Sequence, residues 1–189
     1  MLVDQTTFLT PKVSARLANP RVAYVVIASG TAAWCAALFL APIIAASSGP
    51  FVPVGTIFYQ FFHGICHQID GRSFHVFGQP VAVCSRCSAI YLAFLAGTIL
   101  YPTVRRIGQK ASPARTVLVI SVLPMLLDVF AGFLGVHEIT NLTRSITGAI
   151  FGAVLPFFVI PIATEAFSQL LFSPQQEANA HFQRDLPNV

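Results

Sequence analysis

Cysteine and histidine residues that could bind a metal ion gather in one stretch of the chain. Cys84 and Cys87 form a CxxC motif, and at this spacing both thiolates can reach one tetrahedral ion. Cys66 and His67 lie upstream and complete a four-ligand set of the kind that holds zinc. On a helix, His63 shares a face with Cys66 and can replace His67 as a ligand. The sequence therefore predicts a zinc site with the ligands Cys66, His67, Cys84 and Cys87.

The same cysteines are compatible with other chemistry. Arg86 lies between the thiols of the CxxC motif and would lower their pKa, which suits a membrane oxidoreductase that exchanges thiols and disulfides or reduces a quinone. In an oxidising exterior the cysteines could instead form a plain structural disulfide. The other alternative is a metal-dependent membrane hydrolase, with water at an open metal position and Asp128, Glu138 and Arg86 as catalytic candidates. The abundance of thiolates argues against it, because such sets resemble closed structural zinc sites.

Arginine, aspartate and asparagine residues form a second polar group. Guanidinium forks bind phosphate and carboxylate groups, so this group suits an anionic ligand. We expect Arg144 to pair with Asp128, and Arg86 to neutralise the metal-bound thiolates. The residues predicted to bind the ligand are Arg72, Ser73, Arg86, Asp128, Asn141 and Arg144.

The composition indicates that membrane helices position these residues. Hydrophobic residues make up 55% of the 189 residues and charged residues 10%, whereas soluble domains carry about 25% charged residues. A soluble fold of this size cannot hide so much apolar surface, and lipid removes the need to hide it. We therefore predict an all-α integral membrane protein with four spans of roughly 20 apolar residues each. The predicted spans are residues 22–46, 85–101, 116–136 and 145–172.

A shorter apolar and aromatic stretch, residues 54–66, precedes the Cys/His loop. It is short for a bilayer span and is predicted to be an interfacial or re-entrant helix, with a full fifth span as the alternative. Residues 1–21 and 173–189 are then the cytoplasmic N-terminal segment and tail of a single membrane domain. This orientation rests on basic residues, which favour the cytoplasmic side. They flank the first span or fill the loop after the second: Lys12, Arg16, Arg21, Arg105, Arg106, Lys110 and Arg115.

In this orientation the unusual polar residues lie at the outer leaflet of a multi-pass cell-membrane protein. Their convergence favours a metal-stabilised protein that binds an anionic lipid, a small molecule or a partner. The net charge of +4 is a topology signal, and no basic folded face for nucleic acid is evident. A homo-oligomer and a partner membrane protein both remain open. Gly148 and Gly152 form a GxxxG motif that permits close helix packing, and Cys35 is expected only to pack.

Two blocks of this sequence resemble a family of small prokaryotic membrane proteins, known as a predicted membrane protein or domain of unknown function. The first block is CHQ, RSF and CxRC, followed by an Ile-Tyr pair in the next helix. The second block has an acid in the third span and then Asn and Arg before Thr-Gly. Its residues here are Asp128, Asn141, Arg144, Thr147 and Gly148.

The resemblance covers Tyr59 to Gly152 and implies a site without implying a reaction. The chain departs from the family pattern at Ala89 and Val129, where glycine is usual, which implies slightly different helix packing. The polar set is intact. The resemblance implies that the functional residues are Cys66, His67, Arg72, Ser73, Cys84, Arg86, Cys87, Asp128, Asn141 and Arg144.

Overall fold

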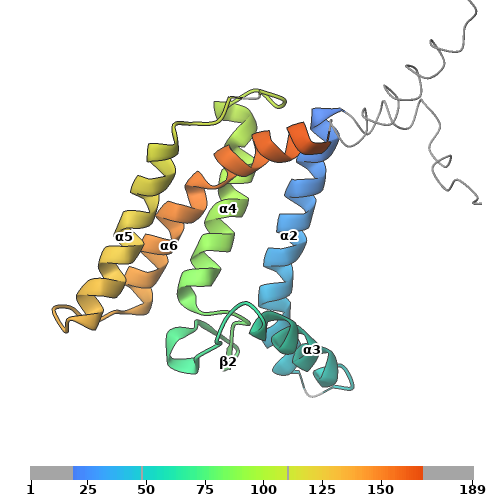
Figure 1. Cartoon of the computed structure of the whole chain (residues 1–189). Coiled ribbons are helices and arrows are strands. Elements are labelled where there is room, and N and C mark those ends of the chain that lie inside the picture. Colours follow the sequence, from blue (N-terminus) through green and yellow to red (C-terminus); the bar gives the residue numbers. More distant parts are fainter. Residues whose placement is uncertain (1–18, 48, 110, 168–189) are drawn as a thin grey trace, which may run out of the picture.

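The computed structural model describes residues 19–47, 49–109 and 111–167 as a helix bundle with a small irregular cap at one end (Figure 1). Four helices are long and apolar enough to cross a membrane, which confirms the predicted all-α membrane fold. These helices are α2 (Pro20–Ala45), α4 (Ser85–Val104), α5 (Arg115–Phe133) and α6 (Asn141–Val154), whose span continues to Phe167.

Helix α6 begins four residues before the predicted start of the fourth span, because a capping box precedes it. Thr140 Oγ1 accepts a hydrogen bond from Thr143 N–H, and Thr143 Oγ1 accepts one from Thr140 N–H, both at 3.2 Å. The box satisfies two backbone donors that the first helical turn leaves without partners. The predicted end of this span, the tail that follows it and residues 1–18 lie outside the described residues.

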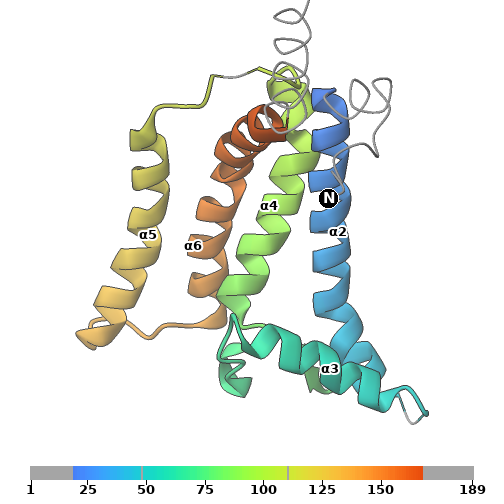
Figure 2. The ribbon, with the colours of Figure 1, turned by 45° about the vertical axis from the view of Figure 1, so that its right-hand side comes forward.

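The closest helix packing joins α4 and α6, which lie side by side in Figures 1 and 2. Gly148 and Gly152 make it possible, as the GxxxG motif predicts. A Cβ on Gly148 would come within 2.7 Å of the Arg86 carbonyl oxygen, and one on Gly152 would overlap the backbone of Ile90. Glycine therefore brings the beginnings of the two helices into backbone contact.

The outer two helices flank this pair on opposite sides (Figure 2). Helix α5 packs on α6, and α2 packs on α4. Tyr24 donates a hydrogen bond to the Thr98 carbonyl oxygen at 3.0 Å, and the buried Cys35 thiol donates one to the Tyr91 carbonyl oxygen at 3.5 Å. Both bonds tie α2 to α4.

The cap connects α2 to α4 and contains α3 (Val52–His63), a 3-10 turn (Asp70–Arg72) and a hairpin of β1 (His75–Val76) and β2 (Gln79–Pro80). Helix α3 lies across the end of the bundle rather than along it (Figures 1 and 2). Its exposed residues include the large apolar side chains of Val52, Ile57 and Phe61. This placement suits a helix at the membrane interface.

A hydrophobic core fastens the cap to the end of α2. Leu38 and Phe62 are fully buried and pack with the segment 81–83 that leads into α4. Gln68, whose φ of 50° turns the chain, donates hydrogen bonds from Nε2 to the carbonyl oxygens of Tyr59 at 2.8 Å and Ala82 at 2.7 Å. The core and these bonds hold the two loop segments that carry the cysteines next to each other.

Candidate functional site

Three cysteines from two segments of the chain meet at the beginning of α4. Cys84 is the N-cap of this helix, Cys87 lies in its first turn, and Cys66 follows α3. Their three Sγ atoms all lie within 4.8 Å of one another, and the Cys84 N–H donates a hydrogen bond to Cys66 Sγ at 3.2 Å. Sulfur atoms this close could bind one metal ion with small side-chain adjustments.

The local electrostatics favour a thiolate at Cys84. A hydrogen bond from the Cys87 thiol lowers the pKa of Cys84 to about 5 and outweighs burial, which acts in the opposite direction. The backbone N–H of Cys87 and the thiol of Cys66 add to this effect. A thiolate is both a metal ligand and a nucleophile, so the same geometry fits both interpretations of the motif.

The histidines are less closely involved than the cysteines. His67 lines the same cavity as the three cysteines, but its ring nitrogens lie outside the cluster of sulfur atoms. His63 ends α3 with an exposed side chain and does not line this cavity. A histidine ligand, with His63 as the substitute, therefore stays a prediction. His75, for which the sequence suggests no role, bonds through Nε2 to Asp70 Oδ1 at 3.0 Å and braces the cap.

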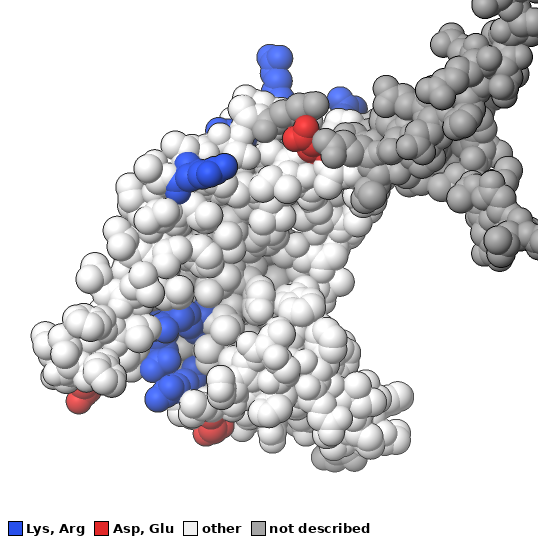
Figure 3. All heavy atoms as spheres, viewed as in Figure 1, with Lys and Arg blue, Asp and Glu red and all other residues white. Residues whose placement is uncertain are grey.

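A cavity of about 380 Å³ joins the cysteines to the arginines. It opens at the starts of α4 and α6, where basic side chains gather on the surface beside the cap (Figure 3). Three arginines from the cap, α4 and α6 line it, so residues far apart in sequence converge on one space. The lining residues are Ile65, Cys66, His67, Gln68, Ile69, Arg72, Cys84, Arg86, Cys87 and Arg144.

The expected partner of Asp128 was Arg144, and this expectation is wrong. Asp128 is buried and accepts from Arg86 NH2 at 2.5 Å through Oδ2, while Oδ1 lies 3.2 Å from His137 Nε2. The reason is the contact at Gly148, which lets the Arg86 side chain pass over α6 towards α5. Among the described residues, Arg144 forms no ion pair of 4 Å or less. Arg86 thus lines the cavity and also forms an ion pair with Asp128.

The other predicted ligand-binding residues support the site from outside the cavity. The Ser73 hydroxyl is buried and donates to the Ile69 carbonyl oxygen at 3.1 Å, which closes the turn that carries Arg72. Asn141 Oδ1 accepts from Ser85 Oγ at 3.0 Å and links the starts of α6 and α4. Glu138, which was a catalytic candidate for the hydrolase and not a predicted ligand-binding residue, is exposed in the α5–α6 loop and does not line the cavity.

Sequence reasoning missed two contributors. Gln68 lines the cavity and fixes its loop through two hydrogen bonds, and its place in the CHQ triplet was the available signal. His137, in the loop between α5 and α6, contacts Asp128. No local pattern could have found this contact, because the chain turns back between the two residues.

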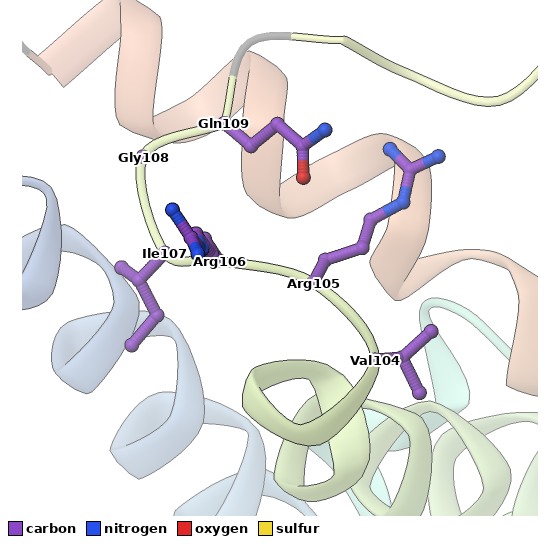
Figure 4. Close-up of a pocket in the computed structure, with 6 residues that line it drawn as sticks. All are labelled: Val104, Arg105, Arg106, Ile107, Gly108 and Gln109. Atoms are coloured by element: carbon purple, nitrogen blue, oxygen red, sulfur yellow. The ribbon is translucent and has the colours of Figure 1, made fainter.

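A second, more open cavity lies at the opposite end of the bundle. It is about 650 Å³ in volume, and it is lined by the last residue of α4, Val104, and the five residues that follow it (Figure 4). Arg105 donates to the Ala111 carbonyl oxygen and so helps to hold this loop. The cavity lining contains no cysteine, histidine or acid, so it has none of the metal ligands, thiol nucleophiles or carboxylate bases that the candidate chemistry requires.

Comparison with known proteins places the chain in a family. The chain is 36% identical to the uncharacterized protein MJ1492 of Methanocaldococcus jannaschii over 131 residues, which cover 68% of this chain and 84% of that protein. It is 33% identical over 87 residues to an uncharacterized protein of Methanothermobacter thermautotrophicus, which cover 46% of this chain and 77% of the relative. No solved structure matches the chain. The family model for a predicted membrane protein (DUF2085) matches residues 66–158, which include all three clustered cysteines and the three arginines. The chain therefore belongs to this family of predicted membrane proteins.

Proposed function

We propose that this protein is a zinc-stabilised membrane protein whose metal site forms the floor of an anion-binding cavity. Cys66, Cys84 and Cys87 supply three thiolates, and His67 is the fourth ligand. The observation that carries the proposal is the convergence of the three sulfur atoms, from separate segments, beside a cavity lined by three arginines.

The metal has a structural task in this proposal. The cap has only short regular elements around a small core, and one of its loop segments carries Cys66. A metal bound by Cys66 together with Cys84 and Cys87 crosslinks this loop to the first turn of α4. Binding energy at such a site adds directly to folding stability. Thiolate-rich tetrahedral sets favour zinc over the hard cations that prefer oxygen ligands.

The arginines that line the cavity give it the positive charge that attracts an anion. Arg86 is balanced by Asp128, whereas Arg72 and Arg144 line the cavity and form no ion pair within the described part of the chain. Guanidinium groups bind phosphate and carboxylate groups through paired hydrogen bonds. Two arginines without a carboxylate partner therefore favour an anionic ligand.

We propose that the cap faces away from the cytoplasm and that both termini are cytoplasmic, in the cell membrane. Arg105, Arg106 and Arg115 border the loop between α4 and α5, at the end of the bundle opposite the cap (Figure 1). Basic residues in short loops favour the cytoplasmic side. Lys12, Arg16 and Lys110, which contribute to the prediction, lie outside the described residues.

The second candidate is a thiol oxidoreductase, and the low pKa of Cys84 favours it. In this reaction Cys84 and Cys87 would lose two electrons and two protons to form a disulfide, and a quinone would take them up to become a quinol. A metal-dependent hydrolase has less support. The proposed bases, Asp128 and Glu138, do not line the cavity, and Asp128 is bound to Arg86.

Elemental analysis combined with a free-thiol count tests the proposal. We expect about one zinc ion per chain in the purified protein, with all four thiols reduced. Cys84→Ser should abolish zinc binding, whereas the matched control Cys35→Ser should retain it, because Cys35 lies in α2 outside the cluster. A metal-free protein with one oxidised pair of cysteines would replace the zinc proposal by the oxidoreductase.

A further inference from the structure

We infer that the cavity binds the phosphodiester headgroup of an anionic membrane lipid, with Arg72 and Arg144 as its cationic contacts. This inference rests on the proposed function and names the ligand that occupies the anion site. It depends on three features of the described residues, namely the depth of the cavity, its charge and its rim.

The cavity lies at the depth of lipid headgroups. Cys84, Arg86 and Cys87 border or enter the first turn of the membrane-spanning helix α4, and Arg144 lies in the first turn of α6. Both helices are apolar enough to cross the bilayer beyond this point. The cavity therefore opens where hydrocarbon gives way to headgroups, and the phosphate of a lipid reaches it without leaving the bilayer.

The charges around the cavity call for a monoanion. Three thiolates and one zinc ion carry a single net negative charge, and a neutral histidine ligand leaves it unchanged. Asp128 cancels Arg86, while Arg72 and Arg144 each contribute a positive charge. One positive charge remains. A phosphodiester carries one negative charge and, unlike chloride, presents two oxygens that can accept from two guanidinium groups at once.

The rim of the cavity contains exposed apolar side chains beside the polar His67 and Gln68. Ile65 and Ile69 both line it, with 50% and 44% of their surfaces exposed. On the same cap, Phe61 is 60% exposed and Phe77 is 78% exposed. Arginines beside a rim with exposed isoleucines match a phosphate attached to glycerol and hydrocarbon chains better than they match a soluble anion, which would leave these isoleucines in water.

A lipid titration of the zinc-loaded protein in detergent micelles tests this inference. Phosphatidylglycerol should raise the melting temperature in a saturable manner, whereas phosphatidylcholine, which has the same phosphodiester but no net charge, should have little effect. Inorganic phosphate at the same concentration should also have little effect. Each of Arg72→Gln and Arg144→Gln should weaken the apparent affinity for phosphatidylglycerol about tenfold without loss of zinc. Arg72 lies in the exposed cap, so its variant should fold even if the Arg144 variant does not.

The matched control is Arg115→Gln, which removes an exposed arginine at the other end of the bundle and should leave the lipid response intact. Equal responses to phosphatidylglycerol and phosphatidylcholine, or an unchanged response in Arg72→Gln, would overturn the inference. A response to inorganic phosphate as large as that to the lipid would show that the ligand is a soluble anion. Stoichiometric zinc without a lipid response refutes the lipid alone, whereas absence of zinc refutes the proposed function.

Discussion

The ion pair between Asp128 and Arg86 supports a quantitative prediction about Asp128→Asn. The Asp128 side chain is 4% exposed and that of Arg86 is 17% exposed, so the substitution leaves a guanidinium group in the bundle without its carboxylate. Loss of one partner from a fully buried pair costs about 3–5 kcal/mol. Arg86 retains contact with the cavity, which lowers this cost. We therefore expect a loss of about 2–3 kcal/mol in the free energy of unfolding.

A double-mutant cycle with Arg86→Gln isolates the pair. Because the second substitution removes the charge that the first left unpaired, the double variant should be more stable than the sum of the two losses predicts, by at least about 1 kcal/mol. The same cycle between Asp128→Asn and Arg144→Gln should show a much smaller coupling, because these residues form no ion pair. Glu138→Gln is the matched control, since it removes an exposed acid from the α5–α6 loop.

The assay is reversible unfolding in mixed micelles with increasing dodecyl sulfate, followed by tryptophan fluorescence. Trp34 is the only tryptophan, and its ring lies 5.2 Å from that of Phe62 and 5.7 Å from that of Tyr91. Its emission therefore reports the contacts between α2, the cap and α4. Additive losses in the Asp128–Arg86 cycle would refute the assigned pair. A large coupling with Arg144 would restore the partner expected from the sequence.

Two glycine substitutions test the helix packing, and an alkylation reaction tests the thiol chemistry. Gly152→Ala should destabilise the protein by about 2 kcal/mol or prevent its folding, since the added carbon overlaps the backbone of Ile90. Gly30→Ala, with no neighbour within 4 Å, should have little effect on the melting temperature, and equal effects would contradict the close contact of α4 and α6. In metal-free, reduced protein, the alkylation rate of Cys84 should rise with pH around a midpoint of about 5 and level off above it, because only the thiolate reacts. A midpoint near that of an ordinary thiol, measured by mass spectrometry of the alkylated peptide, would mean that the hydrogen bond from Cys87 is absent.

The predicted zinc site and the predicted anion site become parts of one structure in this fold. Cys84, Arg86 and Cys87 all lie at the start of α4 and line the same cavity. Metal binding would join Cys66 to this turn and thereby fix the cap segment that carries Arg72. Loss of the metal should then weaken anion binding even though no arginine is changed.

The sequence alone determined the membrane fold and much of the site. Four long apolar segments predict four spanning helices, because backbone groups in lipid must be satisfied within the segment itself. The CxxC motif and the upstream Cys66 predicted the cysteine cluster, since that spacing lets both thiolates reach one ion. Gly148 and Gly152 likewise predicted a close helix contact, because the missing side chains are visible in the sequence.

Only the tertiary structure decided which charges are partners and which remain for a ligand. Asp128, Arg86 and Arg144 are separated by long stretches of chain, and their charges alone allow either arginine to pair with the acid. The choice depends on the rotation of α4 against α6, which the backbone contact at Gly148 sets. As a result Arg86 reaches Asp128, and Arg144 is left to line the cavity with Arg72. Such a choice arises from packing between helices, and periodicity within one helix does not encode it.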